Sequence, residues 1–349
     1  MNLVQAWPEP RSFQFIVTRG ADASKKLLPD LFILGASENA EGLTRALDSV
    51  EGDDVLVQYS GFGFDPKGCP RWMPDVLAAW KLKKKGRRVA IMFHELWTKR
   101  PLWDPRVVRS WRHRYSIGRL IKLSSAVYTN TEGYAGWLRA LNPRVSVSVI
   151  PVGCNVQVQT IADLASRERG LLVVFGKQGT RMLALHTMKE SLARLAQAGR
   201  LNQLLIVGGS PDGAQTELSF ARQFLPEEKL GATGFMDDEA LSELLARAEF
   251  GVSGQDWLSV EKSTTFMAYA AHGLNILSPY AGTDERAPFN WLTGVDELLT
   301  DDMQMEQKLR DRSRSLREWY ESTASWSAIA TKMSAGLRIK NSVSEQVAS

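Results

Sequence analysis

Short apolar segments alternate with longer amphipathic segments along most of the chain. The apolar segments are rich in Val, Ile, Leu and Phe and are bounded by Gly, Pro or polar residues, a pattern typical of buried strands. The predicted strands cover residues 13–19, 31–37, 54–64, 88–96, 126–131, 145–153, 170–176, 202–209, 229–235, 249–254 and 274–279, and the segment 54–64 runs into a glycine-rich loop. The predicted helices cover residues 42–50, 72–86, 104–125, 132–141, 181–197, 214–224, 237–248, 263–271 and 325–338. Strands separated by helices of this length predict βαβ units and parallel sheets.

The alternation is interrupted between residues 151 and 170, where the apolar periodicity is lost. We therefore expect two α/β domains, residues 1–155 and 156–335, followed by a flexible tail over 336–349. Each domain is expected to be a doubly wound, Rossmann-like sheet, in which ligands bind beyond the carboxyl ends of the strands. Two such domains facing each other would form a cleft, and a domain interface is a favoured ligand site.

Composition narrows the class of protein. The 349 residues are 44% hydrophobic and 23% charged, which is ordinary for a soluble globular protein. No apolar run approaches the ~20 residues of a membrane span, and the first residues do not resemble a signal peptide. The cysteines, Cys69 and Cys154, predict small buried thiols in a reducing compartment, and four scattered histidines predict no metal cluster. We expect a cytoplasmic protein.

Positive charge is concentrated in one segment. Residues 81–122 contain fourteen Lys and Arg against two acids, Glu95 and Asp104, so the net charge of this segment is +12. Because the net charge of the whole chain is +4, the other residues together carry −8. Such asymmetry indicates a polyanionic partner: anionic lipid, nucleic acid or a phosphorylated substrate. Trp and Arg on the 104–122 helix favour an anionic membrane surface; the alternative is a helix with a core face and a solvated basic face. No nucleic-acid-binding module is visible.

The segment EKSTTFMAYAAHGLNIL, residues 261–277, places hydroxyl side chains at the start of a helix. A helix N-terminus presents unpaired N–H groups and partial positive charge, and Lys262 adds a full charge. Together with Ser263, Thr264 and Thr265 these groups could hold a phosphate. The alternative is simple capping of the helix by Ser263 or Thr264. The chain has no Walker A motif and no G-x-G-x-x-G, which weakens a P-loop or NAD interpretation.

A second candidate is LLVVFGKQGTRML, residues 171–183, where a buried strand runs into a turn with Lys177 and Arg181. This turn follows the first strand of the second domain, where the doubly wound fold places ligands. A base at the start of a helix opposes the macrodipole, and a bound anion would explain it. The alternative is a solvated turn. The residues of interest are Gly176, Lys177, Gly179, Thr180 and Arg181.

Two candidates lie in the first domain. His94 and Glu95 fall at the end of the strand in VAIMFHELW, where His94 could transfer a proton or bind a sugar hydroxyl, or could be a satisfied polar group. In VQYSGFGFDPKGCPRW, residues 57–72, a strand runs into a glycine-rich loop that allows close backbone approach, or is turn chemistry alone. The candidate residues here are Tyr59, Ser60, Gly61, Phe62, Gly63 and Phe64. The aromatic faces of Tyr59, Phe62 and Phe64 suit a sugar ring or a lipid.

The order of these motifs resembles the GT-B glycosyltransferases, broadly glycosyltransferase family 4, over about residues 54–335. The resemblance rests on VIPVG, LLVVFG with its basic turn, LLIVGG, GFMDDEALSELLARAEFGVSG, the Lys-Ser-Thr-headed helix ending in AAHGL, and the closing SWSAIA helix. It implies two Rossmann-like domains facing across a cleft and a C-terminal helix that crosses back. It also implies transfer of a sugar from a nucleotide diphosphate sugar, with retention of configuration and without a catalytic metal or other cofactor.

The resemblance also implies roles for residues. Lys177 or Arg181 matches the family's phosphate-binding bases, residues 263–265 match the helix start that receives the donor diphosphate, and His94 matches the histidine near the transferred sugar. Gly234 and Phe235 match the turn beside the nucleobase. The implied catalytic residues are His94, Arg181 and Lys262. The implied donor-binding residues are Gly176, Lys177, Gly179, Thr180, Gly234, Phe235, Glu261, Ser263, Thr264 and Thr265, and the acceptor-binding residues are Tyr59, Ser60, Gly61, Phe62, Gly63 and Glu95.

The chain departs from the family pattern at two places. Family members often carry two glutamates around the 263–271 helix; here Glu261 stands beside the first position and Ala268 occupies the second. The loop after the first strand, TRGADASKK, has one glycine instead of two. A polysaccharide-building transferase with a glycan or lipid-linked acceptor remains the main hypothesis. The alternatives are an inverting transferase, an epimerase-like enzyme, or an inactive scaffold that binds active transferases.

Overall fold

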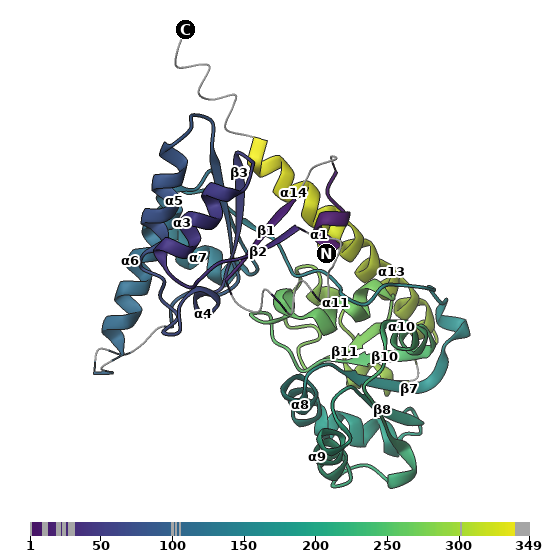
Figure 1. The fold of residues 1–349 in the computed structure, drawn as a ribbon. Coiled ribbons are helices and arrows are strands. Elements are labelled where there is room, and N and C mark those ends of the chain that lie inside the picture. Colours follow the sequence, from purple (N-terminus) through teal and green to yellow (C-terminus); the bar gives the residue numbers. More distant parts are fainter. Residues whose placement is uncertain are drawn as a thin grey trace. The chain divides into compact units, whose positions relative to one another are not determined.

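The computed structural model describes residues 2–8, 13–18, 22, 26, 32–98, 101, 103–104, 106–300 and 302–338 (Figure 1). The chain divides into two compact units. Unit 1 combines Met1–Pro151 with Ile329–Ser349, and unit 2 is Val152–Ala328. Both are α/β units with parallel strands, as the alternation of segments predicted. The sequence placed the boundary between the domains after residue 155, whereas the two units divide after Pro151. The segment from Ile329 onward belongs to unit 1 and not to the second domain.

The main sheet of unit 1 has four strands in sequential order. They are β3 (Asp54–Tyr59), β4 (Arg88–Phe93), β5 (Ala126–Thr129) and β6 (Val147–Val149). Tyr59 lies opposite Phe93, and Phe93 lies opposite Thr129, so the carboxyl ends of three neighbouring strands meet at one edge. A separate parallel pair consists of β1 (Gln14–Val17) and β2 (Phe32–Gly35), and α1 (Asn2–Gln5) precedes it. Most of the loop between β1 and β2, with the glycine departure noted above, lies outside the described residues.

Helices cover both faces of this sheet. On one face, Val89, Ile91 and Phe93 of β4 share a core with four helices: α3 (Ala40–Ser49), α5 (Met73–Leu82), α6 (Val107–Leu123) and α7 (Glu132–Leu141). On the other face, the Tyr128 hydroxyl donates to the Met333 carbonyl, at 2.9 Å, in the C-terminal helix α14 (Trp326–Arg338). Helix α14 continues to Arg338, so residues 336–338, expected to belong to a flexible tail, are helical; residues 339–349 lie outside the described part of the chain.

One short helix replaces a predicted loop. The sequence predicted a glycine-rich loop after β3, whereas residues Gly61–Phe64 form α4. A Cβ atom on Gly61 would lie 2.3 Å from the Gly68 carbonyl oxygen, so only glycine allows this close approach. Gly61 is therefore required for the close packing of α4 against the backbone of Gly68.

The sheet of unit 2 has five parallel strands in the order β11-β10-β7-β8-β9. Their bounds are β7 (Glu168–Phe175), β8 (Gln203–Val207), β9 (Leu230–Gly234), β10 (Ala248–Val252) and β11 (Asn275–Leu277). The chain starts at β7, builds outward to β9, and then returns to the other side of β7 with β10. The carboxyl ends of β7 and β10 therefore flank the topological switch point, where doubly wound sheets bind their ligands.

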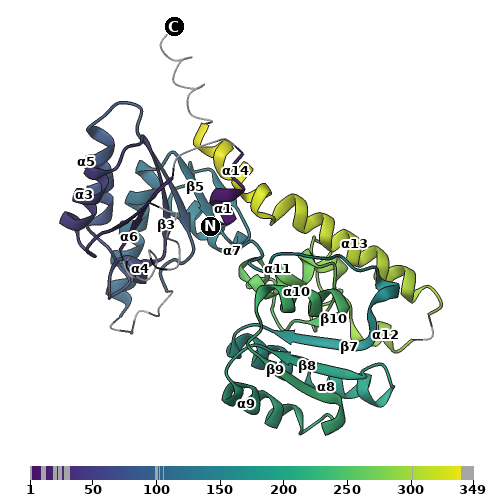
Figure 2. The same ribbon diagram turned by 45° about the vertical axis from the view of Figure 1, so that its right-hand side comes forward.

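The alternating side chains of β7 explain the two layers of helices. Leu172 and Val174 pack against α8 (Gln178–Gln197) and α9 (Pro211–Ala221), whereas Leu171 and Val173 pack against α10 (Asp238–Arg247) and α11 (Thr264–Ala271). Figure 2 shows these two pairs of helices on opposite sides of β7. Helix α13 (Met305–Thr323) packs against α11 and is followed by α14. The remaining short helices are α12 (Val295–Leu298), η1 (Leu164–Ser166), η2 (Glu227–Lys229), η3 (Val260–Lys262) and η4 (Phe289–Trp291).

Two expectations from composition can be compared with the structure. None of the helices in the described part of the chain is both long and apolar enough to cross a lipid bilayer. Cys69 and Cys154 are buried free thiols, as predicted, and burial raises the pKa of Cys154 to about 12. Because a thiolate is the reactive form, Cys154 is inert at neutral pH.

Candidate functional site

Glycines line the carboxyl edge of the unit 2 sheet. Gly176 follows β7, Gly208 and Gly209 follow β8, and Gly234 ends β9, with φ angles of 120°, 100°, 85° and 67°. The Gly208 N–H donates to the Gly234 carbonyl oxygen at 2.8 Å, which ties two of these turns together. Glycine adopts positive φ without strain, so the chain can turn sharply at each of these strand ends. Protein atoms fill the Cβ directions of Gly176 and Gly209, whereas a Cβ atom on Gly234 would have its nearest neighbour 4.0 Å away.

The predicted turn at residues 176–181 lies beside the switch point. Lys177 is exposed and occupies the position before α8, whose first residue is Gln178. Gly179 has open space around its Cα atom, and Thr180 is half-buried. Across the switch point, Gln255 follows β10, and no donor among the described residues reaches its buried Oε1 atom. Sequence analysis missed Gln255, because a lone Gln after a strand carries no distinctive signal.

The start of α11 contacts the turn after β7. A Cβ atom on Gly176 would lie 2.5 Å from Thr265 Oγ1, so Thr265 packs directly against this glycine. Thr265 is buried, whereas Thr264 is exposed, and Lys262 ends η3 just before the helix. The structure thus brings together two predicted donor-binding segments that are far apart in sequence.

Ser263 caps helix α11, which was the alternative to binding a phosphate. Its Oγ atom accepts a hydrogen bond from Phe266 N at 3.0 Å, and the residue is 5% exposed. This is the geometry of an N-cap, so the Ser263 hydroxyl stabilises the helix start. Glu261, the half-buried neighbour of Lys262, offers its carbonyl oxygen to Val152 N at 2.9 Å.

Arg181 lies near the start of α8, where the sequence placed it, but its side chain is buried. It lies one turn into α8, is 1% exposed, and donates from Nε to Glu217 Oε1 at 2.7 Å and from Nη1 to the Gly176 carbonyl at 2.5 Å. Its Nη2 atom lies 2.5 Å from the same Glu217 oxygen without the alignment of a hydrogen bond. A Cβ atom on Gly209 would lie 2.6 Å from Nη2. The base that opposes the α8 macrodipole is therefore neutralised by a carboxylate of the protein, and it supports two glycine turns.

Glu217 was missed by sequence analysis, although a signal exists. It lies on α9 and is 0% exposed. Ala214, Leu218 and Ala221 are buried on the same helix, and Glu217 falls on the stripe that they define. A carboxylate on the buried face of an amphipathic helix needs a partner, and Arg181 supplies it.

The predicted nucleobase turn lies at the far end of the same edge. Gly234 ends β9, and the next residue, Phe235, is 86% exposed. Further exposed apolar side chains follow β10, namely Trp257 and Leu258, at 51% and 48%. The flat ring of Phe235 or Trp257 could stack on a base, and the turns after β7 and β8 lie between the two strand ends that these residues follow.

In unit 1, three residues from neighbouring strands meet at the carboxyl edge. His94 Nε2 lies 2.7 Å from Gln58 Oε1, and His94 Nδ1 lies 3.1 Å from Asn130 Oδ1. Gln58 is in β3, His94 follows β4 and Asn130 follows β5. Asn130 Nδ2 donates to the Ile150 carbonyl at 3.1 Å, which fixes Asn130 Oδ1 as the acceptor for a proton on His94 Nδ1. The Gln58 carboxamide can rotate to donate to His94 Nε2, so the two partners favour the neutral tautomer with its proton on Nδ1. A polar residue at each strand end was the sequence signal for Gln58 and Asn130.

Other predicted acceptor-side residues lie beside this group. Ser60 Oγ donates to Glu95 Oε2 at 2.8 Å, and this contact is exposed. Phe62 is 59% exposed, whereas Gly61 and Gly63 belong to α4. The Glu95 carboxylate retains capacity to accept a bond from a ligand hydroxyl.

The sequence placed Tyr59 at the acceptor site, but its ring lies in the hydrophobic core of unit 1. It is 0% exposed, packs against Phe93 and Phe64, and its hydroxyl lies 2.8 Å from His113 Nε2. Burial raises the pKa of Tyr59 and lowers the pKa of His113 to about 4. No face of Tyr59 is accessible to an acceptor, since the strand alternation turns residue 59 inward and residue 58 outward.

Metal ligands were not expected, and the described side chains form no group of three or more His, Cys, Asp and Glu residues that could hold a metal ion. The candidate charges at the donor edge are instead Lys177, Lys262 and the N–H groups at the start of α11.

No protein-family model matches the sequence, and no curated protein is similar to it in sequence. Solved structures are similar in fold. A glycosyltransferase from Rickettsia africae matches with a TM-score of 0.59 and 11% identity, over 93% of this chain and 88% of that one. HepE from Anabaena, in complex with UDP and glucose, matches with a TM-score of 0.55 and 13% identity, over 90% and 89%. The chain has the GT-B fold.

The GT-B fold is shared by more than one activity. UDP-GlcNAc 2-epimerase from Neisseria meningitidis, bound to UDP-GlcNAc, matches with a TM-score of 0.51 and 11% identity, over 96% of this chain and 94% of that one. At such low identity the likeness establishes the fold alone, and the chemistry has to be argued from the residues of this chain.

Proposed function

We propose that this GT-B protein is a glycosyltransferase that moves a sugar from a nucleotide diphosphate sugar to a glycan or lipid-linked acceptor. The observation that carries this proposal is the contact between Thr265, at the start of α11, and Gly176, in the turn after β7. It joins a helix N-terminus to a bare glycine turn at the switch point of unit 2. A diphosphate fits such a place, because backbone N–H groups and the helix dipole favour negative charge there.

The reaction that we propose is electrostatic in character. As the glycosidic bond to the diphosphate breaks, negative charge develops on the leaving phosphate oxygens. Lys177, Lys262 and the first N–H groups of α11 would stabilise that charge without a metal, and Arg181 would act indirectly by holding the Gly176 turn. Each fixed donor of this kind raises the reaction rate about 10²–10³-fold. Retention of configuration is part of the proposal and is tested by the anomeric form of the product.

A uridine nucleotide is the first donor to test. HepE binds UDP and the Neisseria epimerase binds UDP-GlcNAc, which supports the choice of base in a protein of the same fold. In this chain, Phe235 is the exposed aromatic side chain beside the last glycine turn, and we propose that it borders the base.

For the acceptor, we propose that His94 receives or positions the proton of the attacking hydroxyl, with Ser60 and Glu95 binding sugar hydroxyls. The paired carboxamides Gln58 and Asn130 hold the imidazole in place. A lipid-linked acceptor would place the protein in the cytoplasm at the inner face of a membrane, in the synthesis of a polysaccharide.

Two alternatives have specific support. The epimerase of the same fold favours an epimerase-like reaction. The buried Ala268 in α11, where the resembling family often has a glutamate, favours a scaffold that binds nucleotide without turnover. Transfer and epimerisation give different products and binding without turnover gives none, so product analysis separates the three.

A thermal-shift screen tests the proposal. The protein is heated with UDP, GDP, ADP or CMP, and with the corresponding sugars, first without metal and then with EDTA. A ligand at about 100 times its Kd stabilises the folded state by roughly 2.7 kcal/mol. We expect a shift with one nucleotide class that EDTA does not remove. The absence of a shift with every nucleotide would overturn the assignment of the unit 2 edge as a donor site.

A further inference from the structure

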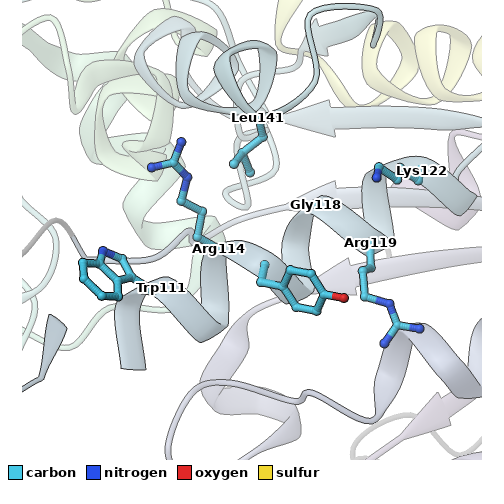
Figure 3. Close-up of a pocket in the computed structure, with 7 residues that line it drawn as sticks. Trp111, Arg114, Gly118, Arg119, Lys122 and Leu141 are labelled. Carbon is cyan, nitrogen blue, oxygen red and sulfur yellow. The ribbon is translucent and has the colours of Figure 1, made fainter. Parts of the chain in front are cut away.

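A hollow of about 350 Å³ lies along α6 in unit 1, away from the residues discussed above. It is lined by Trp111, Arg114, Tyr115, Gly118, Arg119, Lys122 and Leu141 (Figure 3). Six of these residues belong to α6, and Leu141 is the last residue of α7. Trp111 and Lys122 are eleven positions apart, so the hollow extends ~16 Å along the helix. We call it the α6 hollow.

Gly118 forms the floor of the α6 hollow. A Cβ atom on Gly118 would meet no other atom within 4 Å, so the space above it is open. Arg114 and Lys122 lie one helical turn before and after it, on the same side of α6. The absence of a side chain at residue 118 thus leaves room between two cations, and a residue with a side chain would fill it.

The charge of α6 has one sign. The sequence VVRSWRHRYSIGRLIKL contains four Arg and one Lys and no acidic residue. Arg119 is paired with Asp75. No carboxylate among the described residues pairs with Arg114 or Lys122, and both side chains are exposed. The Arg114 guanidinium also lies over the Trp97 ring, 5.8 Å from the ring centre. The α6 hollow therefore offers an anionic group two cations that no described carboxylate neutralises.

Apolar side chains continue the same stripe of α6 toward its N-terminus. Val108, Trp111 and Tyr115 are 45%, 56% and 71% exposed, and their spacing of three and four places them on one face. Trp103, just before the helix, is 86% exposed. Trp and Tyr are the side chains that favour the boundary between lipid and water. Exposed aromatic side chains interspersed with cations along one helix match an interfacial helix.

We propose that the α6 hollow binds the phosphate-containing headgroup of an anionic membrane lipid, with α6 lying along the bilayer surface. The phosphate sits above Gly118 between Arg114 and Lys122, and Trp111 and Tyr115 enter the interface beside it. Charge complementarity selects the lipid, since the site is cationic and an anionic leaflet attracts each Lys or Arg near its surface. The proposal rests on the membrane setting of the proposed function and not on the transfer reaction.

Binding to lipid vesicles tests the proposal. The full chain, without nucleotide, is sedimented with vesicles of phosphatidylcholine alone and of phosphatidylcholine mixed with phosphatidylglycerol. We expect binding to the mixed vesicles at low salt, loss of binding at high salt, and little binding to phosphatidylcholine. Free glycerol phosphate is added as a competitor, and weak competition is expected because it lacks the surface that α6 lies on.

Three variants separate a built site from a merely basic surface. Gly118→Met fills the α6 hollow, keeps every charge and favours the helix; we expect about tenfold weaker binding to mixed vesicles. Arg114→Glu with Lys122→Glu is expected to weaken binding more than about a hundredfold. Trp111→Ala with Tyr115→Ala is expected to weaken it about tenfold through loss of apolar burial.

A matched control changes the same charge elsewhere. Lys85→Glu with Arg200→Glu alters the net charge by the same amount, at two exposed positions outside α6, and is expected to stay within about threefold of the parent. Circular dichroism and the melting temperature establish that every variant is folded. Thermal shift with nucleotide is measured on the same proteins, so loss of vesicle binding with an intact nucleotide response distinguishes the two proposals.

Three results would overturn the headgroup site. The first is no binding of the parent protein to mixed vesicles at low salt. The second is binding of Gly118→Met equal to the parent, which would show a diffuse basic surface. The third is tighter binding to a soluble polyanion, such as a single-stranded oligonucleotide, with the same dependence on Arg114 and Lys122.

Discussion

Arg181 and Glu217 form an ion pair that is almost completely excluded from solvent. The two side chains are 1% and 0% exposed, and the Arg181 Nε–H donates to Glu217 Oε1 at 2.7 Å. The pair joins α8 to α9 underneath the glycine turns of the donor edge. A charge that would be expensive to bury alone is buried here because its partner is buried with it.

The first prediction concerns the stability of this pair. Arg181→Ala or Glu217→Ala leaves one charge buried and unpaired, so each should lower the free energy of unfolding by about 3–5 kcal/mol. The double variant Arg181→Met with Glu217→Leu removes both charges and should cost clearly less than the sum of the single variants. Urea unfolding measures all three. Equal effects of the double variant and the summed singles would contradict the coupling.

The second prediction concerns Lys177, which carries an exposed cation at the same edge. Lys177→Ala should weaken binding of the responding nucleotide about tenfold to a hundredfold, because a charge-assisted hydrogen bond is lost. Stability without ligand should not change. Lys189→Ala, an exposed lysine further along α8, is the control and should bind as the parent does. Isothermal titration measures both, and equal affinities for the two variants would remove Lys177 from the site.

The third prediction separates capping from ligand binding at the start of α11. Ser263→Ala removes the bond to Phe266 N and should destabilise the protein by about 1 kcal/mol. Thr264→Ala, at an exposed position, should leave stability unchanged and weaken nucleotide binding. Chemical unfolding and nucleotide titration of the two variants give the comparison. The assignment fails if Thr264→Ala destabilises and Ser263→Ala does not.

The fourth prediction concerns pH. Burial lowers the pKa of His113 from 6.5 to about 4, although Glu95 and Asp65 act in the opposite direction. Between these values the unfolded chain binds more protons than the folded one, so stability is lost as the pH falls from 6.5 to about 4. The loss reaches up to about 3 kcal/mol. His113→Gln keeps a polar partner for Tyr59 but does not titrate.

Unfolding of the parent and of His113→Gln at several pH values between 7 and 4 measures this effect. The stability of the parent should fall more steeply than that of the variant, although the variant is less stable at pH 7. Parallel curves would show that His113 takes up its proton in the folded state at an ordinary pH.

The fifth prediction concerns His94. His94→Gln should lower the rate of sugar transfer about 10²–10⁴-fold, the usual contribution of a general acid or base. The thermal shift with donor nucleotide should be retained, because His94 lies in unit 1 and the proposed donor edge lies in unit 2. Single-turnover assays measure the rate. An unchanged rate would show that His94 is only a satisfied polar group beside Gln58 and Asn130.

Several features of the fold could be predicted because they are local. Alternating apolar and amphipathic segments predicted the parallel strands, and the end of one apolar segment predicted that His94 and Glu95 lie at the ligand-binding edge of the sheet. The helix α13 escaped prediction because its buried side chains, Leu309, Leu316 and Tyr320, are too sparse to form a continuous stripe. The helix α4 escaped because four residues with two glycines resemble a loop.

The roles of individual charged residues depended on tertiary partners. The sequence predicted that the basic turn at 176–181 lies at the carboxyl edge of the unit 2 sheet. It did not predict which of the two basic side chains would be exposed. Lys177 faces solvent, whereas Arg181 turns inward because Glu217 lies on the buried stripe of a helix thirty-six positions later. Tyr59 was placed at an acceptor site by its motif, yet the period of the strand directs it to the core. Strand order, which defines the switch point, is likewise a tertiary property.

Unit 1 is interrupted in the sequence by the whole of unit 2. Its first part ends at Pro151, and its last part begins at Ile329, where α14 supplies the carbonyl of Met333 to the Tyr128 hydroxyl. On the ribosome, residues 152–328 therefore emerge as one continuous stretch before unit 1 receives α14. Unit 2 can fold as soon as it is made, whereas the sheet face around Tyr128 is covered only after residues 329–338 have been made. A chain that stops near residue 328 would leave that face uncovered.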